Sequence, residues 1–166
     1  MITIKEPIEK QRINLNTLNE IIYYIKEEFK LKHPCLIYMG GSLVYYGLRD
    51  YTNDLDCGVS TDDFENMLNI LKESGYDTEI YKKSLGNRGF KLYYKNHEIE
   101  IFDSNFMNDK NYDMAKEYCI ENHETVYFQS LIQILEIKKR LNRDKDRNDI
   151  RMIEEFLRDW AKYSNL

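Results

Sequence analysis

The 166-residue chain contains little cysteine, proline or glycine and has no long hydrophobic run. Its 3 cysteines, Cys35, Cys57 and Cys119, form no Cys-x-x-Cys pair, which argues against a disulfide framework or a zinc site and favours reduced thiols. No apolar stretch approaches the ~20 residues of a membrane-spanning helix. The charged N-terminus also lacks the apolar segment of a signal peptide. The sequence therefore predicts a cytoplasmic protein with no membrane contact and no export signal.

A surplus of positive charge is also absent. Lys and Arg number 24 against 29 Asp and Glu, so the formal net charge is −5. Proteins that coat nucleic acid must neutralise many phosphates, and this balance excludes that class. A hydrophobic content of 42%, with 14 Tyr and 7 Phe, is sufficient for a core. At ~100–200 residues per domain, we expect one domain over residues 1–166. Its core would span about 15–105 and a C-terminal helical part about 112–166.

Hydrophobic periodicity predicts an α+β fold. Thr17 and Glu20 have the spacing of a capping box, and Gly75 suits the end of a helix. We expect a mixed, mostly antiparallel sheet flanked by helices, with a C-terminal helical hairpin and an N-terminal arm over residues 1–14. The expected helices are 17–31, 43–48, 61–74, 128–141 and 145–163. The expected strands are 35–39, 53–59, 76–83, 90–94 and 98–102, and the last two would form a hairpin around Lys95-Asn96-His97.

Two adjacent glycines, Gly40 and Gly41, precede Ser42 where the apolar strand 35–39 ends. Backbone without Cβ atoms can approach an anion closely, and the start of the following short helix is electropositive. The motif therefore predicts a turn that binds phosphate. The alternative is a tight structural turn in which Ser42 caps the helix.

Eleven residues separate Ser42 from Asp54, which is followed by Leu55 and Asp56. On a strand, side chains alternate, so both carboxylates would share one face while Leu55 enters the core. Mg²⁺ is often held by one or two carboxylates together with substrate phosphates. The pair predicts a divalent-metal site beside the phosphate turn, and a solvated strand end is the alternative.

A third acid is expected on the strand 98–102. Ile99 and Ile101 would be buried on one face, which turns Glu98 and Glu100 to the other face. We select Glu100 as the third carboxylate, with Glu98 as the competing choice. An exposed hairpin on which Glu100 faces solvent remains the alternative.

These motifs resemble the nucleotidyltransferase superfamily with the polymerase-β-type core. The matching segments are Met39-Gly40-Gly41-Ser42, Asp54-Leu55-Asp56 and Ile99-Glu100-Ile101. The resemblance implies the nucleotidyltransferase fold, a turn that holds a triphosphate, and Mg²⁺, or alternatively Mn²⁺, on the first two acids. It also implies that the third acid binds metal or activates the acceptor hydroxyl. The family usually has Asp at this third position, so Glu100 keeps the charge on a longer arm. Arg49 and Thr52 resemble the Arg and Thr or Ser that small bacterial members place before the acid pair.

A second block extends the resemblance toward the C-terminus. It resembles the C-terminal motif of abortive-infection-type nucleotidyltransferase toxins, and a shorter form of it occurs in lincosamide nucleotidyltransferases. The block consists of Lys138, Arg143, Lys145, Asp146, Asp149 and Ile150.

Helical geometry supports this second block. Lys138 would project from an apolar face that includes Leu131 and Leu135, where a lysine needs an anion. Along the last helix, Lys145, Asp146 and Asp149 would point the same way as Ile153, Phe156 and Trp160. We predict that Lys138 and Lys145 contact phosphate or nucleotide, and that Asp146 and Asp149 orient them or contact the base or ribose. A solvated linker between two helices is the alternative.

The sequence thus predicts Mg²⁺-dependent transfer of a nucleoside monophosphate from an NTP to an acceptor hydroxyl, with release of pyrophosphate. A toxin-like enzyme that modifies tRNA or protein, and that a partner antitoxin neutralises, is slightly favoured by the longer C-terminal motif. The alternatives are an enzyme that confers antibiotic resistance by modifying a lincosamide or aminoglycoside, and a nucleotide-binding module without catalysis.

Overall fold

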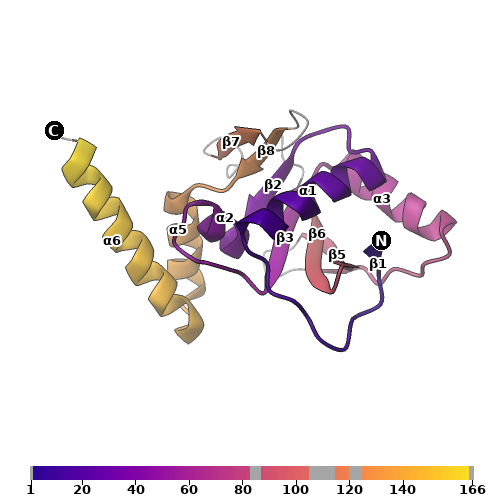
Figure 1. The fold of residues 1–166 in the computed structure, drawn as a ribbon, viewed down its shortest axis with the longest axis horizontal. Coiled ribbons are helices and arrows are strands. Elements are labelled where there is room, and N and C mark those ends of the chain that lie inside the picture. The colour runs from indigo at the N-terminus through magenta and orange to yellow at the C-terminus, as the bar shows by residue number, and fades with distance from the viewer. Residues whose placement is uncertain (1, 83–86, 105–114, 120–124, 165–166) are drawn as a thin grey trace.

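The computed structural model describes residues 2–82, 87–104, 115–119 and 125–164, and every structural statement below concerns this part of the chain (Figure 1). It has the expected mixed, mostly antiparallel sheet with flanking helices. The strands are β1 (Ile2–Thr3), β2 (Cys35–Tyr38), β3 (Asp54–Val59), β4 (Tyr81–Lys82), β5 (Arg88–Tyr94), β6 (His97–Asp103), β7 (Lys116–Cys119) and β8 (Thr125–Phe128). The helices are α1 (Leu15–Phe29), α2 (Met39–Tyr45), α3 (Thr61–Glu73), α5 (Leu131–Leu141), the short 3₁₀ helix η3 (Asp144–Asp146) and α6 (Arg147–Ser164).

The sheet order is β1-β5-β6-β3-β2-β8-β7, with β4 paired to β5. The central strand β3 is antiparallel to β2 and parallel to β6, and β2 is parallel to β8. Strands β5 and β6 form the expected hairpin, which turns at Lys95 and Asn96, both with positive φ. The two strands that carry the predicted acids are therefore neighbours at the centre of the sheet.

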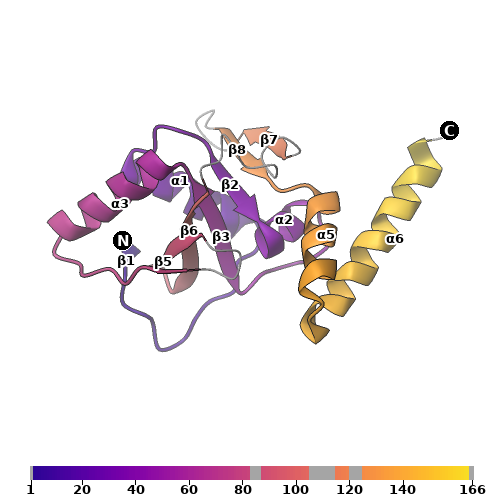
Figure 2. The same ribbon diagram turned by 180° about the vertical axis from the view of Figure 1, so that it is seen from behind.

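Helices α1 and α3 cover one face of this sheet (Figure 1). Their apolar stripes, with Leu18, Ile22 and Phe64 fully buried, pack against inward residues of the strands such as Leu55 and Ile99. Figure 2 shows the opposite face, beside which α5 stands. That opposite face is the one to which strand alternation directs Asp54, Asp56 and Glu100.

Several element boundaries differ from the sequence-based expectations. Helix α1 begins at Leu15, because the side chain of Asn14 accepts a hydrogen bond from the Thr17 N–H at 2.9 Å and caps it. Residues 40–42 lie in the first turn of α2 rather than in a turn before it. Within residues 76–82, the described part of the expected strand 76–83, only Tyr81–Lys82 is paired. Within the expected helical part from about 112, β7 and β8 extend the sheet, and Ser130 caps the start of α5.

The C-terminal helical hairpin forms as expected, but the apolar stripe of α6 is only partly covered. Ile153 is fully buried against α5 and α2, and Phe156 and Leu157 are half-buried. Trp160 is 67% exposed, which corrects the expectation that it faces the core with Ile153. Figures 1 and 2 show the reason: α6 diverges from α5 and its C-terminal end leaves the body of the molecule.

The two cysteines whose side chains the structure describes agree with the expectation of reduced thiols. Cys35 and Cys57 are free thiols buried in the adjacent strands β2 and β3. Cys119 belongs to β7, and its side chain lies outside the described residues. Among the described helices none has the length and apolar character required to cross a membrane.

Candidate active site

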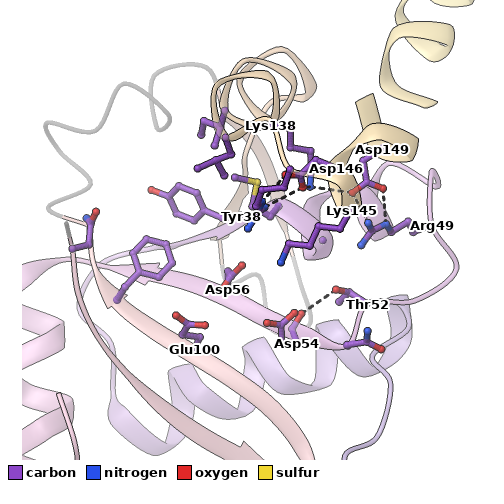
Figure 3. Close-up of a pocket in the computed structure, with 18 of the residues that line it drawn as sticks. Tyr38, Arg49, Thr52, Asp54, Asp56, Glu100, Lys138, Lys145, Asp146 and Asp149 are labelled. Carbon is purple, nitrogen blue, oxygen red and sulfur yellow. Dashed lines mark hydrogen bonds and ion pairs between the residues drawn. The ribbon is translucent and has the colours of Figure 1, made fainter. Parts of the chain in front are cut away.

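The predicted acids Asp54, Asp56 and Glu100 meet on the face of the sheet opposite α1 and α3 (Figure 3). Asp56 lies directly beside Glu100 in the parallel pairing of β3 with β6. One carboxylate oxygen from each of the three acids lies within 4.8 Å of the others, and all three side chains are half-buried. Leu55, between the two aspartates, is fully buried on the other face as predicted.

The donor chemistry of this cluster fits a hard divalent cation. Three like charges at such short range repel one another unless a cation neutralises them. Carboxylate oxygens are the ligands that Mg²⁺ and Mn²⁺ prefer. The cluster, which we call the acid triad, could therefore hold one of these ions between Asp54, Asp56 and Glu100.

Glu98, the competing third acid, is held by two lysines. It lies beside Asp54 in the sheet, but its carboxylate accepts from Lys10 Nζ at 2.7 Å and pairs with Lys91 Nζ at 2.5 Å. Burial alone would raise the pKa of Glu98, but the two ammonium groups outweigh it and lower that pKa. The structure thus groups Glu100, and not Glu98, with the aspartates.

The glycines of the phosphate motif serve close packing. A Cβ atom on Gly40 would lie 2.3 Å from Thr52 Oγ1, and one on Gly41 would lie 2.6 Å from Ile37 Cγ2. Gly40 lines the cavity beside the acid triad, whereas Gly41 and Ser42 are buried behind it. The hydroxyl of Ser42 donates to the carbonyl of Ile37 at 2.8 Å.

The junction between β2 and α2 depends on a residue that the sequence analysis missed. Met39 has a φ of 49°, in the left-handed region. Its N–H donates to Gln129 Oε1 at 3.1 Å, while the N–H of Gln129 donates to the Ile37 carbonyl at 2.9 Å. Gln129 is fully buried. A glutamine directly after an apolar strand was the available signal, but β8 itself was not anticipated.

Thr52 is buried at the entry to β3. Its backbone exchanges two hydrogen bonds with Ile13, at 2.8 and 2.9 Å, and its hydroxyl donates to the Asp54 carbonyl at 3.1 Å. The residues of the N-terminal arm therefore help to fix the first aspartate of the acid triad.

Residues of the C-terminal motif form an ion cluster with Arg49. Lys138, Asp146 and Asp149 are buried in it, while Arg143 is exposed and Arg49 is half-buried. Lys138 Nζ lies 3.0 Å from a carboxylate oxygen of Asp146 and 3.0 Å from one of Asp149. Arg143 Nε donates to Asp146 at 2.6 Å, and the guanidinium of Arg49 pairs with Asp149. The anion that the buried Lys138 requires is thus supplied by the chain itself. The cluster connects α5, η3 and α6 to the segment between α2 and β3.

Within this cluster, the surrounding charges favour the ionised form of Asp146. Burial would raise the pKa of Asp146, but hydrogen bonds from Arg143 and Lys138 outweigh it and lower the pKa to about 2. Three cations face two carboxylates, so the ion cluster has a surplus of positive charge toward the cavity.

Lys145 differs from the other cations of the site. It is exposed, and its ammonium group forms no hydrogen bond or ion pair with the described part of the chain. Figure 3 shows its side chain reaching into the pocket toward Asp54 and Asp56.

A cavity of about 650 Å³ joins the acid triad to the ion cluster. The acids form one wall, and Lys138 and Lys145 lie in the other (Figure 3). Arg143 also lines the cavity. Tyr38 and Phe102, whose ring centroids are 4.7 Å apart, and Tyr81 complete the lining near Glu100. Sequence analysis did not identify these aromatic residues, because the strand pairing that brings them together is non-local.

Neither a protein-family model nor a curated protein sequence matches the chain. Solved structures do match it. A protein from Thermotoga maritima assigned as a nucleotidyltransferase is 13% identical over 92% of this chain and 98% of its own, with a TM-score of 0.56. The lincosamide antibiotic adenylyltransferase LnuA, solved with lincomycin, is 13% identical over 87% of this chain and 98% of its own, with a TM-score of 0.58. The antibiotic-resistance factor ANT(2'')-Ia is 14% identical over 85% and 83%, with a TM-score of 0.54. The chain therefore has the nucleotidyltransferase fold.

Proposed function

We propose that this protein transfers a nucleoside monophosphate from an NTP to an acceptor hydroxyl. The observation that carries the proposal is the convergence of Asp54, Asp56 and Glu100 on one wall of a cavity whose other wall is cationic. Nucleotidyl transfer needs a cation site for the triphosphate and positive charge for the leaving group. The fold shared with nucleotidyltransferases supports the same conclusion.

In this reaction the acceptor oxygen attacks the α-phosphorus, and the bond from that phosphorus to the oxygen bridging to the β-phosphate breaks. Pyrophosphate leaves with the electron pair of that bond. The hydroxyl proton passes to a base, for which Glu100 is the candidate. Asp54 and Asp56, with Glu100, would hold Mg²⁺ or alternatively Mn²⁺. A bound metal would neutralise the triphosphate and acidify the attacking hydroxyl.

The cationic wall would bind the phosphates. Lys145 contacts them directly, because its ammonium group reaches the cavity without an internal partner. Lys138 and Arg49, which Asp146 and Asp149 orient, add positive charge near the pyrophosphate. Gly40, in the first turn of α2, and Thr52 shape the adjacent wall, where Gly40 presents no side chain to the nucleotide. Gly41 and Ser42 lie behind this wall and support the turn.

Two acceptor classes are each supported by a different observation. LnuA, solved with lincomycin, supports a small hydroxylated antibiotic. The C-terminal motif and the basic residues between Lys138 and Arg151 support a tRNA end or a protein side chain, in the manner of toxin-like relatives with an antitoxin partner. The shared reaction is the same in both cases.

Incubation of the protein with each labelled NTP and Mg²⁺, first with bulk tRNA and then with lincosamides and aminoglycosides, tests the proposal. We expect a labelled product from one acceptor class and release of pyrophosphate. Labelled RNA would establish the toxin-like acceptor, and a labelled antibiotic would establish resistance chemistry. Tight NTP binding with no product from any acceptor, including protein, would contradict the proposal in favour of a non-catalytic nucleotide-binding module.

A further inference from the structure

Tyr81 reaches the acid triad from the short edge strand β4. It lies opposite Gly89 on β5, and Gly89 lies opposite Phe102 on β6. Directly opposed residues project on the same face of a sheet. Tyr81 therefore shares the face of Phe102 and of Glu100, which is two residues earlier on β6. Because Gly89 has no side chain, the ring of Tyr81 has room to extend over β5 toward β6.

The hydroxyl of Tyr81 is buried and close enough to the Glu100 carboxylate to interact with it. Its oxygen is shielded from solvent and forms no hydrogen bond of normal geometry with the described residues. Burial, and next the charge of Glu100, raise the pKa of Tyr81, so the hydroxyl keeps its proton at neutral pH. A buried hydroxyl that lacks a hydrogen bond of normal geometry is destabilising, so its position beside the acid triad requires an explanation.

The long side chain of Glu100 explains this position, because it needs a hydrogen-bond donor to hold its carboxylate in place. Glutamate has one more rotatable bond than aspartate, so its carboxylate samples more positions about the metal site. A donor that fixes one carboxylate oxygen would leave the other oxygen directed at the metal or the acceptor hydroxyl. Residues that hold metal-binding side chains in this way typically contribute ~10–100-fold to metal affinity or activity.

We propose that Tyr81 is a positioning residue whose hydroxyl donates a hydrogen bond to the Glu100 carboxylate in the metal-loaded site. The inference rests on the proposed nucleotidyl transfer and extends it to a residue outside the recognised motifs. It assigns to Tyr81 the task of restraining the longer arm of Glu100.

The test compares Tyr81→Phe with Tyr94→Phe. Tyr94 is a matched control, because its hydroxyl also meets a glutamate, donating to Glu20 Oε1 at 3.0 Å, but outside the cavity. For Tyr81→Phe we expect kcat and the Mn²⁺ affinity of the nucleotide-free protein each to fall about tenfold. The KM for the NTP should stay within about twofold. The Tm should be unchanged or higher, because a buried hydroxyl that lacks a hydrogen bond of normal geometry has been removed. Tyr94→Phe should leave kcat and Mn²⁺ affinity unchanged.

A double-mutant cycle asks whether Tyr81 acts through Glu100. Mn²⁺ affinity is measured for Glu100→Ala with and without Tyr81→Phe, and no further loss is expected in the double variant. Equal Mn²⁺ affinities and kcat values for Tyr81→Phe and Tyr94→Phe would overturn the proposal, as would an undiminished effect of Tyr81→Phe in the Glu100→Ala background. A wild-type protein that transfers no nucleotide would contradict the proposed function, while the Mn²⁺ measurements would still decide the role of Tyr81.

Discussion

The acid triad concentrates negative charge at a single point of the sheet. Replacing Asp54 or Asp56 by Asn should abolish nucleotidyl transfer, because each supplies an oxygen to the proposed metal site. The metal-free fold should be retained or stabilised, since like-charge repulsion is reduced. Transfer assays, Mn²⁺ calorimetry and thermal unfolding would check this, with the exposed Asp77→Asn as control. Wild-type turnover in both aspartate variants would show that the acid triad is not required for nucleotidyl transfer.

Lys145 allows a second test at the level of one side chain. The change Lys145→Met should raise the KM for the NTP about tenfold, or about 1.4 kcal/mol, with little loss of stability because no internal ion pair is broken. Lys139→Met is the matched control, since Lys139 pairs with Glu154 at 2.7 Å on the exposed side of the hairpin. Steady-state kinetics would measure both variants. Equal KM values would exclude a phosphate contact by Lys145.

The residues of the site differ in how far the sequence could predict them. Asp54, Asp56 and Glu100 were accessible because strand alternation is a local property, and the structure brings all three together. Lys138 was expected to need an anion, and one of the two roles predicted for Asp146 and Asp149 was to orient the lysines; the structure pairs both acids with Lys138. Gln129 and Tyr81 were missed, because they reach the site only through the order of strands in the sheet.

At the scale of elements, α2 can pack closely against the start of β3 because Gly40 has no Cβ atom. Gly40→Ala would place a Cβ 2.3 Å from Thr52 Oγ1, and we expect a loss of about 1–3 kcal/mol in the free energy of unfolding. In a Thr52→Ala background the same change should cost less, since the oxygen in conflict is absent. Chemical denaturation of the four proteins would measure this coupling. If Gly40→Ala lowered the free energy of unfolding equally in both backgrounds, α2 would not pack against Thr52 as described.

The strength of each local signal explains which elements were predictable. Helix α3 was predicted to within a residue, because Ser60 caps its start and Gly75, with a φ of 86°, follows its end. The hairpin of β5 and β6 was also predicted, since alternation and the Lys95-Asn96 turn agree. Strand β8 is too short to show a period, and it is stabilised by its pairing with β2 rather than by its own residues.

At the scale of the whole molecule, the ion cluster joins the C-terminal hairpin to the sheet and should make the protein sensitive to acid. The pKa of Asp146 in the folded protein is about 2, below its ordinary value of 3.8. A depressed pKa adds stability that is complete above about pH 4 and is lost as the pH falls toward 2.

Asp146 should therefore account for about 2 kcal/mol of the stability lost over this range. Asp146→Asn should be less stable at pH 6, because Arg143 loses its charged partner and Lys138 loses one of two. Its unfolding free energy should also depend less on pH between 4 and 2. Urea unfolding at several pH values would provide the comparison. Parallel pH profiles for the two proteins would contradict this assignment.

The net charge of −5 also has a spatial meaning in the folded molecule. Composition excluded a nucleic-acid coat protein, but it could not show that acids and bases gather on opposite walls of one cavity. That separation arises from sheet order and from the position of α5, which join distant parts of the chain. This separation of charge therefore cannot be inferred from the amino-acid composition.

The exposed end of α6 has a spectroscopic consequence. Trp160 is the single tryptophan of the chain and is 67% exposed, whereas most of the fluorescent tyrosines lie on the sheet and its covering helices. Excitation at the red edge of the indole band should give the emission of a water-exposed indole, readily quenched by a soluble quencher such as acrylamide. Saturating the cavity with nucleotide should leave this emission unchanged. Any molecule that covers the far end of α6 should shift the emission to shorter wavelength, so one native chromophore distinguishes events on that helix from events at the acid triad.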